Sequence, residues 1–440
     1  MIFKRKLYDK LLVWKQQTAG TKALLIEGAR RIGKSTLVEE FAKNEYRSYL
    51  MIDFNKVSDS VISAFNNYMN DLDTFFLILS SEYGVRLYPK ESIIIFDEIQ
   101  QFPKARQAIK YLVADGRFDY IETGSLISIK ENVNDITIPS EERTLLMYPM
   151  DFEEFAWAMN EEPLMAYIRQ CFDKKVPLEQ GIHAKAMLLF RQYMIVGGMP
   201  KSLSAYLENN RSFEMADMEK RDILTLYRND IKKIKSGYRS SVLSIFDQIP
   251  AFLSRSERRV VMNRIEKGAS FPKYHDTFFW LSDSMIANEC FNCSDPNVGL
   301  SLNEDRTYVK CYMGDTGLLI SHTFDENEIS DGELYREILL GKLSVNEGMF
   351  YENVIAQMLV AAGHKLYFYT RYNQEKHRND MEIDFILSNH SKLRYKIFPI
   401  EVKSNDKYSI RSLTRFNESF RQRIGGSYVI HPKNLNVRKL

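Results

Sequence analysis

Short apolar runs alternate with helical patterns over the first 150 residues. Four runs contain consecutive apolar residues rather than an alternating pattern, which is typical of strands buried on both faces: Ala23–Glu27, Tyr49–Phe54, Ser92–Phe96 and Asp119–Thr123. Helical patterns fill the gaps between them. Because strands that alternate with helices form βαβ units, the pattern predicts an α/β domain over residues 1–150. Its parallel sheet should be covered by helices on both faces.

The pattern changes after residue 150. Apolar residues at helix-like intervals predict a helical subdomain over residues 151–230, interrupted at Gly197-Gly198-Met199-Pro200. Residues 231–322 remain helical up to a strand-like run at Thr307–Tyr312, an order that suits a small winged-helix module. The two segments therefore predict a helical lid and a winged-helix-like domain.

Residues 323–344 are acidic and polar, as expected of a linker. The remainder, residues 345–440, begins with a helical pattern and continues with strand-like runs. These elements are expected at 345–362 (helix), 365–370, 382–387 and 395–402 (strands), 410–423 (helix) and 427–431 (strand). The order predicts a second α/β domain at the end of the chain.

A phosphate-binding motif follows the first predicted strand. Gly28-Ala29-Arg30-Arg31-Ile32-Gly33-Lys34-Ser35 fits G-x-x-x-x-G-K-[ST] and opens a helix. The glycines let backbone N–H groups turn toward phosphates, and the helix N-terminus favours an anion. Lys34 would reach the β- and γ-phosphates, Ser35 would bind Mg²⁺ and Thr36 would support the loop. The sequence therefore predicts a site for ATP and Mg²⁺.

A second motif lies where this site requires it. The apolar run Ile93–Phe96 ends in Asp97 and Glu98. Asp97 would hold Mg²⁺, and Glu98 would act as the general base on the attacking water, unless it is a structural helix cap. Thr123 and Ser125, at the end of another strand, would contact the γ-phosphate or the water, unless they form a simple turn.

Transition-state charge in such enzymes is often neutralised by an arginine. The sequence offers Arg143, which follows two acidic residues, and Arg221 or Arg228 in the helical region. Each is equally compatible with a surface role, and the arginine could also come from a neighbouring subunit of a homo-oligomer.

These motifs carry a resemblance to a known family. GARRIGKST, IIIFDEIQ, TGS, YPMDFEEF and GGMP resemble the AAA+ type P-loop ATPases of bacteria and archaea that carry a C-terminal DUF4143-like domain with a nuclease-like fold. The resemblance extends over IPAFLS, Tyr274–Ile286 and MGDTGLL. In that family YPMDFEEF marks the passage from ATPase core to helical lid, which implies the same boundary in this chain.

Acidic and basic residues of the last domain form a further pattern. Asp384 lies in one strand-like run, and Glu401 and Lys403 alternate on another, so that both point to one face. Two carboxylates at this spacing predict a Mg²⁺ site, with Lys403 stabilising charge on a phosphodiester. Glu352, on the preceding helix, could add a third carboxylate.

This set resembles the PD-(D/E)xK nuclease superfamily, although Ile383 replaces the proline before the aspartate. The resemblance implies a nuclease-like fold with Asp384, Glu401 and Lys403 as catalytic residues, and Glu352, Asp384 and Glu401 as metal ligands. Two other interpretations remain open: a solvent-facing strand edge that alternates Glu and Lys, and a nuclease-like domain that binds without cleaving.

Charge is segregated along the chain. The 440 residues contain 60 basic and 58 acidic side chains, a net charge of +2, and 27% charged residues exclude wholesale disorder. Residues 221–273 hold twelve basic against five acidic residues, and residues 371–440 hold fifteen against seven. Clusters such as Lys232-Lys233 and Arg258-Arg259 therefore predict contact with DNA, unless they are solvated helix faces.

Four cysteines are too few for a disulfide framework, and we interpret Cys290 and Cys293 as packing residues. Neither a signal peptide nor an 18-residue apolar stretch is apparent, which predicts a cytoplasmic protein without a membrane partner.

The combined prediction is a Mg²⁺-dependent ATPase that couples its nucleotide state to DNA engagement. A regulatory switch with a silent nuclease-like domain and a protein-remodelling ATPase are the alternatives.

Overall fold

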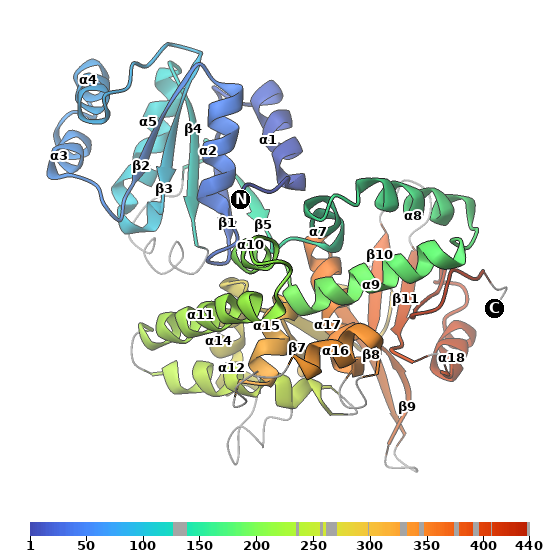
Figure 1. Cartoon of the computed structure of the whole chain (residues 1–440). Coiled ribbons are helices and arrows are strands. Elements are labelled where there is room, and N and C mark those ends of the chain that lie inside the picture. Colours follow the sequence, from blue (N-terminus) through green and yellow to red (C-terminus); the bar gives the residue numbers. More distant parts are fainter. Residues whose placement is uncertain are drawn as a thin grey trace. The chain divides into compact units, whose positions relative to one another are not determined.

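The computed structural model describes residues 1–125, 139–234, 237–255, 258–260, 271–297, 299–325, 332–342, 347–373, 378–389, 396–405 and 407–437. The chain forms two compact units (Figure 1). Unit 1 comprises Met1–Tyr148 with Asp283–Met285, and unit 2 comprises Pro149–Ser282 with Ile286–Leu440.

Unit 1 is built on a five-stranded parallel sheet in the order β2-β3-β4-β1-β5. The strands are β1 (Ala23–Gly28), β2 (Ser48–Asp53), β3 (Ser92–Asp97), β4 (Asp119–Gly124) and β5 (Glu142–Met147). The prediction of an α/β fold with a parallel sheet is confirmed. β5 was not predicted, because this edge strand is partly exposed and lacks a continuous apolar run.

Helices cover both faces of this sheet (Figure 1). They are α1 (Lys6–Gln17), α2 (Lys34–Glu45), α3 (Asp59–Asn67), α4 (Leu72–Tyr83) and α5 (Pro103–Asp115), with a short 3₁₀ turn, η1 (Ile99–Gln101). Alternate strand residues such as Leu25 and Ile94 pack into one core with α3, α4 and α5. Leu24 and Ile26 are equally buried. Burial on both faces explains the continuously apolar strands.

Unit 2 begins with helices. These are α7 (Phe152–Ala158), α8 (Glu162–Lys174), α9 (Gln180–Val196), α10 (Pro200–Glu208), α11 (Phe213–Lys232), α12 (Arg239–Leu253), α14 (Phe271–Asp283), α15 (Thr316–Thr323) and α16 (Glu333–Leu340). The DFEE run has a local structural role. Asp151 caps α7 by accepting from the Glu154 backbone, and the Glu154 side chain accepts from Asp151 in return.

Two glycine motifs that are distant in sequence meet inside unit 2. The Gly198 N–H donates to Asp315 Oδ2 over 2.5 Å, and a Cβ on Gly317 would lie 2.6 Å from Gly197 Cα. A Cβ on Gly198 would lie 2.2 Å from the Met150 carbonyl oxygen. Backbone approaches this close require glycine. GGMP and MGDTG are therefore a packing junction.

Two small sheets complete unit 2. One has the order β7-β6-β8-β9 and the other β10-β11-β12. Their strands are β6 (Ala287–Cys293), β7 (Glu304–Met313), β8 (Leu366–Asn373), β9 (Arg378–Ile383), β10 (Phe385–Asn389), β11 (Lys396–Val402) and β12 (Tyr428–Ile430). Between them lie η2 (Leu300–Asn303), α17 (Glu347–Ala361) and α18 (Arg411–Ser419).

The first sheet crosses a boundary between two predicted domains. β6 pairs with β7 and also, in parallel, with β8, so one sheet joins the predicted winged-helix-like segment (231–322) to the predicted final domain (345–440). β6 was missed because ANECFNC mixes polar residues into the run. Cys293 and Leu300 share a core with Leu413 and Phe416 of α18. The predicted winged-helix-like segment therefore shares a sheet and a core with the predicted final domain.

Candidate functional site: the phosphate loop and a carboxylate cluster

The phosphate loop connects β1 to α2 in a tightly fixed conformation. Arg31 and Gly33 adopt positive φ angles of 68° and 91°. A Cβ on Gly28 would lie 2.4 Å from the Met147 carbonyl oxygen, so β5 leaves no room for another residue there. The buried Arg5 side chain donates to the Ile32 carbonyl over 2.9 Å. Arg5 was not among the predicted residues, because it lies far along the chain from the motif that it supports.

The Lys34 ammonium group lies inside this loop. Its Nζ donates to the carbonyl oxygens of Gly28 and Ala29 over 3.0 and 2.9 Å, and the side chain is 6% exposed. Burial lowers the pKa of Lys34 to about 8, while the nearby carboxylates of Glu98 and Asp97 oppose that shift. The loop therefore holds a weakly compensated ammonium group, which phosphate oxygens could bind.

Asp97 is the centre of a small hydrogen-bond network. Ser35 Oγ donates to Asp97 Oδ1 over 2.8 Å, and Thr123 Oγ1 donates to the same oxygen. Burial raises the pKa of Asp97, and these two hydrogen bonds act against the increase. The arrangement follows from the sheet, because Asp97 and Thr123 end the neighbouring strands β3 and β4.

These residues fit a magnesium ion. Mg²⁺ takes oxygen ligands and usually keeps water and phosphate oxygens in its shell. The Ser35 hydroxyl and the Asp97 carboxylate present two such oxygens side by side at the end of β3. They are the residues that would hold the ion.

Glu98 follows Asp97 in a left-handed conformation, with φ 55°. Its carboxylate accepts from Gln100 Nε2 over 2.5 Å, and its side chain does not cap η1. The structure thus gives no support to the helix-cap alternative. Ser125 is buried directly after β4, and Thr36 is exposed in the first turn of α2. Their contact with a nucleotide stays a prediction.

Of the three candidate arginines, only Arg143 belongs to the unit that carries the loop. Arg143 lies exposed on β5 and pairs with Leu24, four residues before Gly28. In unit 2, Arg221 forms ion pairs with Asp217 and Asp325. Arg228 pairs with Asp247 and also with Asp325. Both side chains therefore serve contacts within unit 2.

A second cluster lies in unit 2 around the buried Glu352 of α17. Lys310 Nζ lies 3.2 Å from Glu352 Oε1, and the Tyr312 hydroxyl donates to the same oxygen over 2.5 Å. The Arg258 guanidinium contacts Glu352 Oε2. Neither Glu352 nor Lys310 is exposed to solvent. Two cations thus neutralise this carboxylate. Lys310 was not among the predicted residues, because it lies on β7, outside the predicted nuclease-like domain.

Lys310 also faces the carboxylates that join β9 to β10. Its Nζ lies 3.0 Å from Glu382 Oε1 and 3.9 Å from Asp384 Oδ1. Asp384 separates the two strands, where its Oδ2 accepts from the Val402 backbone over 2.8 Å. The predicted single strand at 382–387 is therefore broken, because the Asp384 side chain bonds to β11.

Glu401 lies on β11 beside this group and is 1% exposed. Burial raises its pKa; the Lys403 ammonium, 3.1 Å from Oε2, lowers it, and the Asp384 charge adds to the increase. The predicted quartet of Glu352, Asp384, Glu401 and Lys403 thus lies on neighbouring elements. Lys310, which the prediction did not include, lies between Glu352 and Asp384.

The C-terminal carboxylates, as they lie, do not fit a divalent metal centre. Within the ranges that the structure describes, no three acidic, histidine or cysteine side chains are arranged to hold a metal ion. Lys310 stands within 4 Å of Glu352, Glu382 and Asp384, where such an ion would bind. An ammonium group there supplies the positive charge that a cation would bring. Metal binding by Glu352, Asp384 and Glu401 stays a prediction that this geometry does not favour.

The first basic segment is largely used inside unit 2. Arg221, Arg228 and Arg258 form the ion pairs described above, whereas Lys232 and Lys233 are exposed. Lys235, Arg264 and Lys267 lie outside the described residues. The second segment exposes more charge, through Lys407, Arg411, Arg415, Arg421 and Lys433. Of the two segments, the second therefore exposes more of its described basic residues.

The thiols of unit 2 are buried. Burial raises the pKa of Cys293 to about 11, which keeps this thiol protonated.

Among the helices of the described ranges, none combines the length and the apolar character needed to cross a membrane.

Three family models match the chain. Residues 20–156 match an AAA domain, residues 187–328 a domain of unknown function (DUF8612), and residues 347–439 another domain of unknown function (DUF4143). The first covers the phosphate loop, Asp97 and Thr123. The last two meet in one sheet, because β6 lies in one match and β8 in the other. Comparison with curated proteins gives no match.

Solved structures of AAA-type proteins are similar at low identity. The Thermotoga maritima RuvB Holliday junction branch migration motor is 12% identical, over 65% of this chain and 89% of its own, with a TM-score of 0.27. Cdc6p from Pyrobaculum aerophilum is 11% identical, over 77% and 93%, with a TM-score of 0.26. AMPPCP-bound DnaA from Aquifex aeolicus is 11% identical, over 64% and 90%, with a TM-score of 0.25.

TM-scores this far below 0.5 do not establish a common arrangement of whole chains, so the assignment rests on the matched domains and on the sheet. The chain thus carries an AAA domain with the P-loop ATPase fold at residues 20–156 and a DUF4143 domain at residues 347–439.

Proposed function

We propose that this protein is a cytoplasmic, Mg²⁺-dependent ATPase whose nucleotide state controls how unit 2 engages DNA. The observation that carries the ATPase assignment is the convergence of Ser35 and Thr123 on one oxygen of Asp97. The phosphate loop, the end of β3 and the end of β4 meet at this oxygen. A chance match to the phosphate-loop motif would not produce such a meeting. Nucleotide binding would also involve the loop residues Gly28–Thr36.

Each residue of the site has a distinct task in hydrolysis. Lys34 exchanges its two carbonyl partners for phosphate oxygens, and loop N–H groups bind the remaining charge. Glu98 accepts a proton from the attacking water, and Thr123 holds Asp97 in place. Mg²⁺, when bound at Ser35 and Asp97, supplies neutralisation of the developing phosphoryl charge.

The cluster around Lys310 supports a binding role for the nuclease-like domain. Glu352, Asp384 and Glu401 each lie within 4 Å of a lysine ammonium of the protein. Removing Lys310 to admit a metal ion would require a buried ammonium group to leave its partners, which is costly. We therefore favour DNA engagement without cleavage. Catalysis by Asp384, Glu401 and Lys403 is the second candidate function.

DNA is the proposed partner because exposed cations gather on the last part of unit 2. α18 buries Leu413 and Phe416 and leaves Arg411 and Arg415 exposed. Contacts of this kind to phosphates make affinity fall with salt. Arg143 pairs with Leu24 and so lies four residues before the loop begins at Gly28. The transition-state arginine would therefore come from a neighbouring subunit of a homo-oligomer.

The test is ATP hydrolysis and DNA retention measured on the same preparations. Lys34→Ala should abolish hydrolysis, because the phosphates lose their cation, and a variant with full activity would sink the ATPase assignment. DNA binding by fluorescence anisotropy should differ between ADP and a non-hydrolysable ATP analogue, and should weaken between 50 and 200 mM salt.

A protein-remodelling ATPase without a DNA role predicts no DNA retention at any salt concentration. Cleavage is tested with linear and plasmid DNA in Mg²⁺ or Mn²⁺. Cutting by the native chain that disappears in Asp384→Ala would overturn the non-cleaving proposal.

A further inference from the structure

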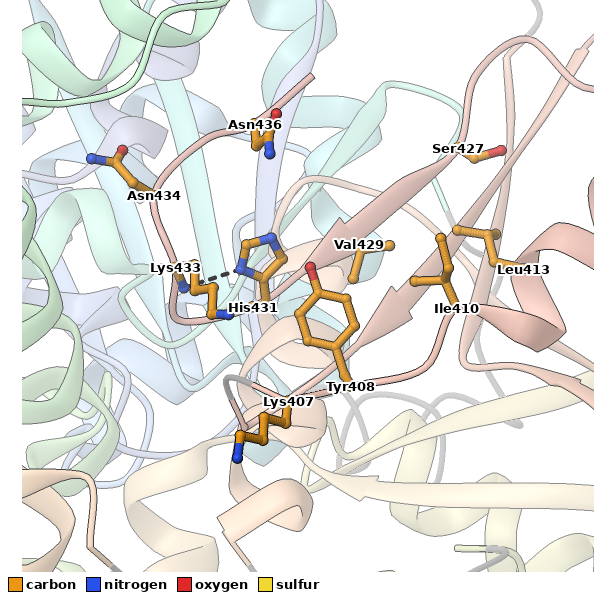
Figure 2. Close-up of a pocket in the computed structure, with 10 residues that line it drawn as sticks. All are labelled: Lys407, Tyr408, Ile410, Leu413, Ser427, Val429, His431, Lys433, Asn434 and Asn436. Carbon is orange, nitrogen blue, oxygen red and sulfur yellow. Dashed lines mark hydrogen bonds between the residues drawn. The ribbon is translucent and has the colours of Figure 1, made fainter. Parts of the chain in front are cut away.

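A cavity of about 520 Å³ opens beside β12 of unit 2 (Figure 2). Its lining comes from the segment after β11, from the start of α18, and from β12 with the residues that follow. The volume is in the range of small-molecule sites. No step of the proposed ATPase cycle uses this cavity.

The floor of the cavity is apolar and one wall is aromatic. Ile410, Leu413 and Val429 supply the aliphatic surface. The Tyr408 ring lies with its centroid 5.1 Å from that of His431, at an interplanar angle of 32° (Figure 2). Such a wall offers a flat face to a planar ring.

The histidine has a defined tautomer in this arrangement. The Lys433 backbone N–H donates to His431 Nδ1 over 3.0 Å, so a neutral His431 carries its proton on Nε2 (Figure 2). The residues that follow β12 are also fixed. Asn434 Nδ2 donates to the Leu178 carbonyl over 2.7 Å, and Asn434 Oδ1 accepts from the Leu178 N–H over 2.9 Å. The wall is therefore held in place.

The rim of the cavity is positively charged. Lys407 and Lys433 line it with exposed side chains, and none of the ten lining residues is acidic. Lys310 and Lys403 of the carboxylate cluster, by contrast, lie beside acidic side chains. An aliphatic floor, an aromatic wall and a cationic rim together select a ligand with a planar ring and an anionic group.

We propose that this cavity binds one nucleoside monophosphate unit, with its base against Tyr408 and its phosphate near Lys407 and Lys433. The proposal deepens the DNA engagement proposed above and rests on it for the source of the nucleotide. An unpaired nucleotide of a single strand would present this unit, because its base is free to stack. A base inside a duplex would not.

The chemistry is shared by a free mononucleotide, so the experiment has separate arms. Anisotropy of a 3′-labelled dT12 strand, of the same strand in a blunt duplex, and competition by dAMP are measured with the full-length chain. Native protein should bind the single strand more tightly than the duplex. Millimolar dAMP should displace the strand only partly, because it offers one unit.

Variants assign this binding to the cavity. Tyr408→Ala should weaken strand binding about tenfold or more, and Tyr408→Phe should retain it, because the ring face is kept. Lys407→Gln with Lys433→Gln should lower the slope of log affinity against log salt by about 0.7, because one phosphate of the single strand loses its cations. The matched control, Lys56→Gln with Lys110→Gln, removes two exposed lysines of unit 1. It should bind as the native chain does.

Three outcomes would overturn the inference: Tyr408→Ala binding like the native chain, an unchanged salt slope in the cavity lysine variant, or equal loss in the control. If the native chain binds DNA and the cavity variants bind equally well, the cavity proposal fails and DNA engagement stands. If dAMP binds through Tyr408 but no strand is retained, DNA engagement fails and the cavity remains a nucleotide site.

Discussion

The Lys310 ammonium lies 3.2 Å from Glu352 Oε1, and neither side chain is exposed to solvent. The pair connects β7 to α17, two elements that the sequence assigned to different domains. Glu382 and Asp384 share the same ammonium group. A buried ion pair of this kind makes each partner depend on the other, because an isolated buried charge is strongly unfavourable.

Replacement of Lys310 by methionine should therefore destabilise unit 2. The change leaves Glu352 with Arg258 and Tyr312 but without its buried lysine, which should cost about 3–5 kcal/mol. Denaturant unfolding followed by circular dichroism measures this loss.

The double variant Lys310→Met with Glu352→Gln is the control and should recover much of the loss. Mn²⁺ should raise the melting temperature of Lys310→Met more than that of the native chain, because the vacated position can accept a cation. An equal rise in both proteins would contradict the assigned role of Lys310.

ATP binding should take up protons near pH 8. The pKa of Lys34 in the free protein is lowered to about 8, and bound phosphates should raise it again. At pH 8 about half a proton should be taken up per ATP, and almost none at pH 6. Affinity should fall as the pH rises above 8.

Calorimetric titration of ATP in two buffers of different ionisation enthalpy measures the proton uptake. Lys34→Arg is the control, because arginine keeps its charge throughout. Uptake that persists in Lys34→Arg would assign the proton to another group.

Thr123→Val should slow hydrolysis and leave nucleotide affinity nearly unchanged. The substitution keeps the shape of the side chain and removes the hydroxyl that donates to Asp97. Loss of a hydrogen bond that orients a metal-binding carboxylate should lower kcat about 10–100-fold.

Steady-state ATPase assays and a fluorescent-nucleotide titration separate these two effects. Thr21→Val removes an exposed hydroxyl elsewhere in unit 1 and should behave as the native chain does. A parallel loss of affinity in Thr123→Val would place Thr123 on the nucleotide instead.

Glu289 should make unit 2 less stable as the pH rises. Burial raises its pKa to about 7, against an ordinary value of 4.5, although the charges of His275 and Arg306 oppose the shift. The folded carboxyl group thus keeps its proton between pH 4.5 and 7 while the unfolded one loses it. Stability falls across that window and stays lower above pH 7.

Glu289→Gln should therefore stabilise unit 2 by about 1–3 kcal/mol at pH 8 and have little effect near pH 4.5. Melting temperatures at the two pH values provide the comparison. A gain of equal size at both would show that titration is not the cause.

Gly198→Ala should disrupt the junction of the two glycine motifs. The added Cβ would lie 2.2 Å from the Met150 carbonyl oxygen, and backbone must move to relieve the clash. We expect a loss of several kcal/mol, measured by chemical unfolding. Gly181→Ala is the matched control in the same unit, since its Cβ would meet only the flexible Glu179 carboxylate.

Much of unit 1 could be predicted from the sequence because its strands are buried on both faces. Continuous apolar runs such as Ile93–Phe96 give an unambiguous signal, and the phosphate loop has a fixed spacing. β5 escaped prediction because Arg143 and Thr144 are exposed on it. Arg5 escaped because long-range support of a loop leaves no local pattern.

Unit 2 was harder for a physical reason. β6 carries polar side chains, such as Asn292 and Glu289, whose partners come from elements that are distant in sequence. In the sequence, Lys310 cannot be told from any other lysine on a strand. Its three carboxylate neighbours become apparent only in the folded chain. Residues 352, 384, 401 and 403 were predicted as a set. The ion pairs of Lys310 with Glu352 and Asp384, and of Arg258 with Glu352, required the tertiary structure.

The paired hydrogen bonds between Asn434 and Leu178 join residues 256 positions apart. This contact joins the segment between α8 and α9 to the residues that follow β12, so it connects the start and the end of unit 2. A tag or truncation at the C-terminus would therefore act on the helical start of the unit as well as on its end. Asn434 and its neighbours tie the two ends of unit 2 together, so removing them should loosen elements that lie more than half the chain away.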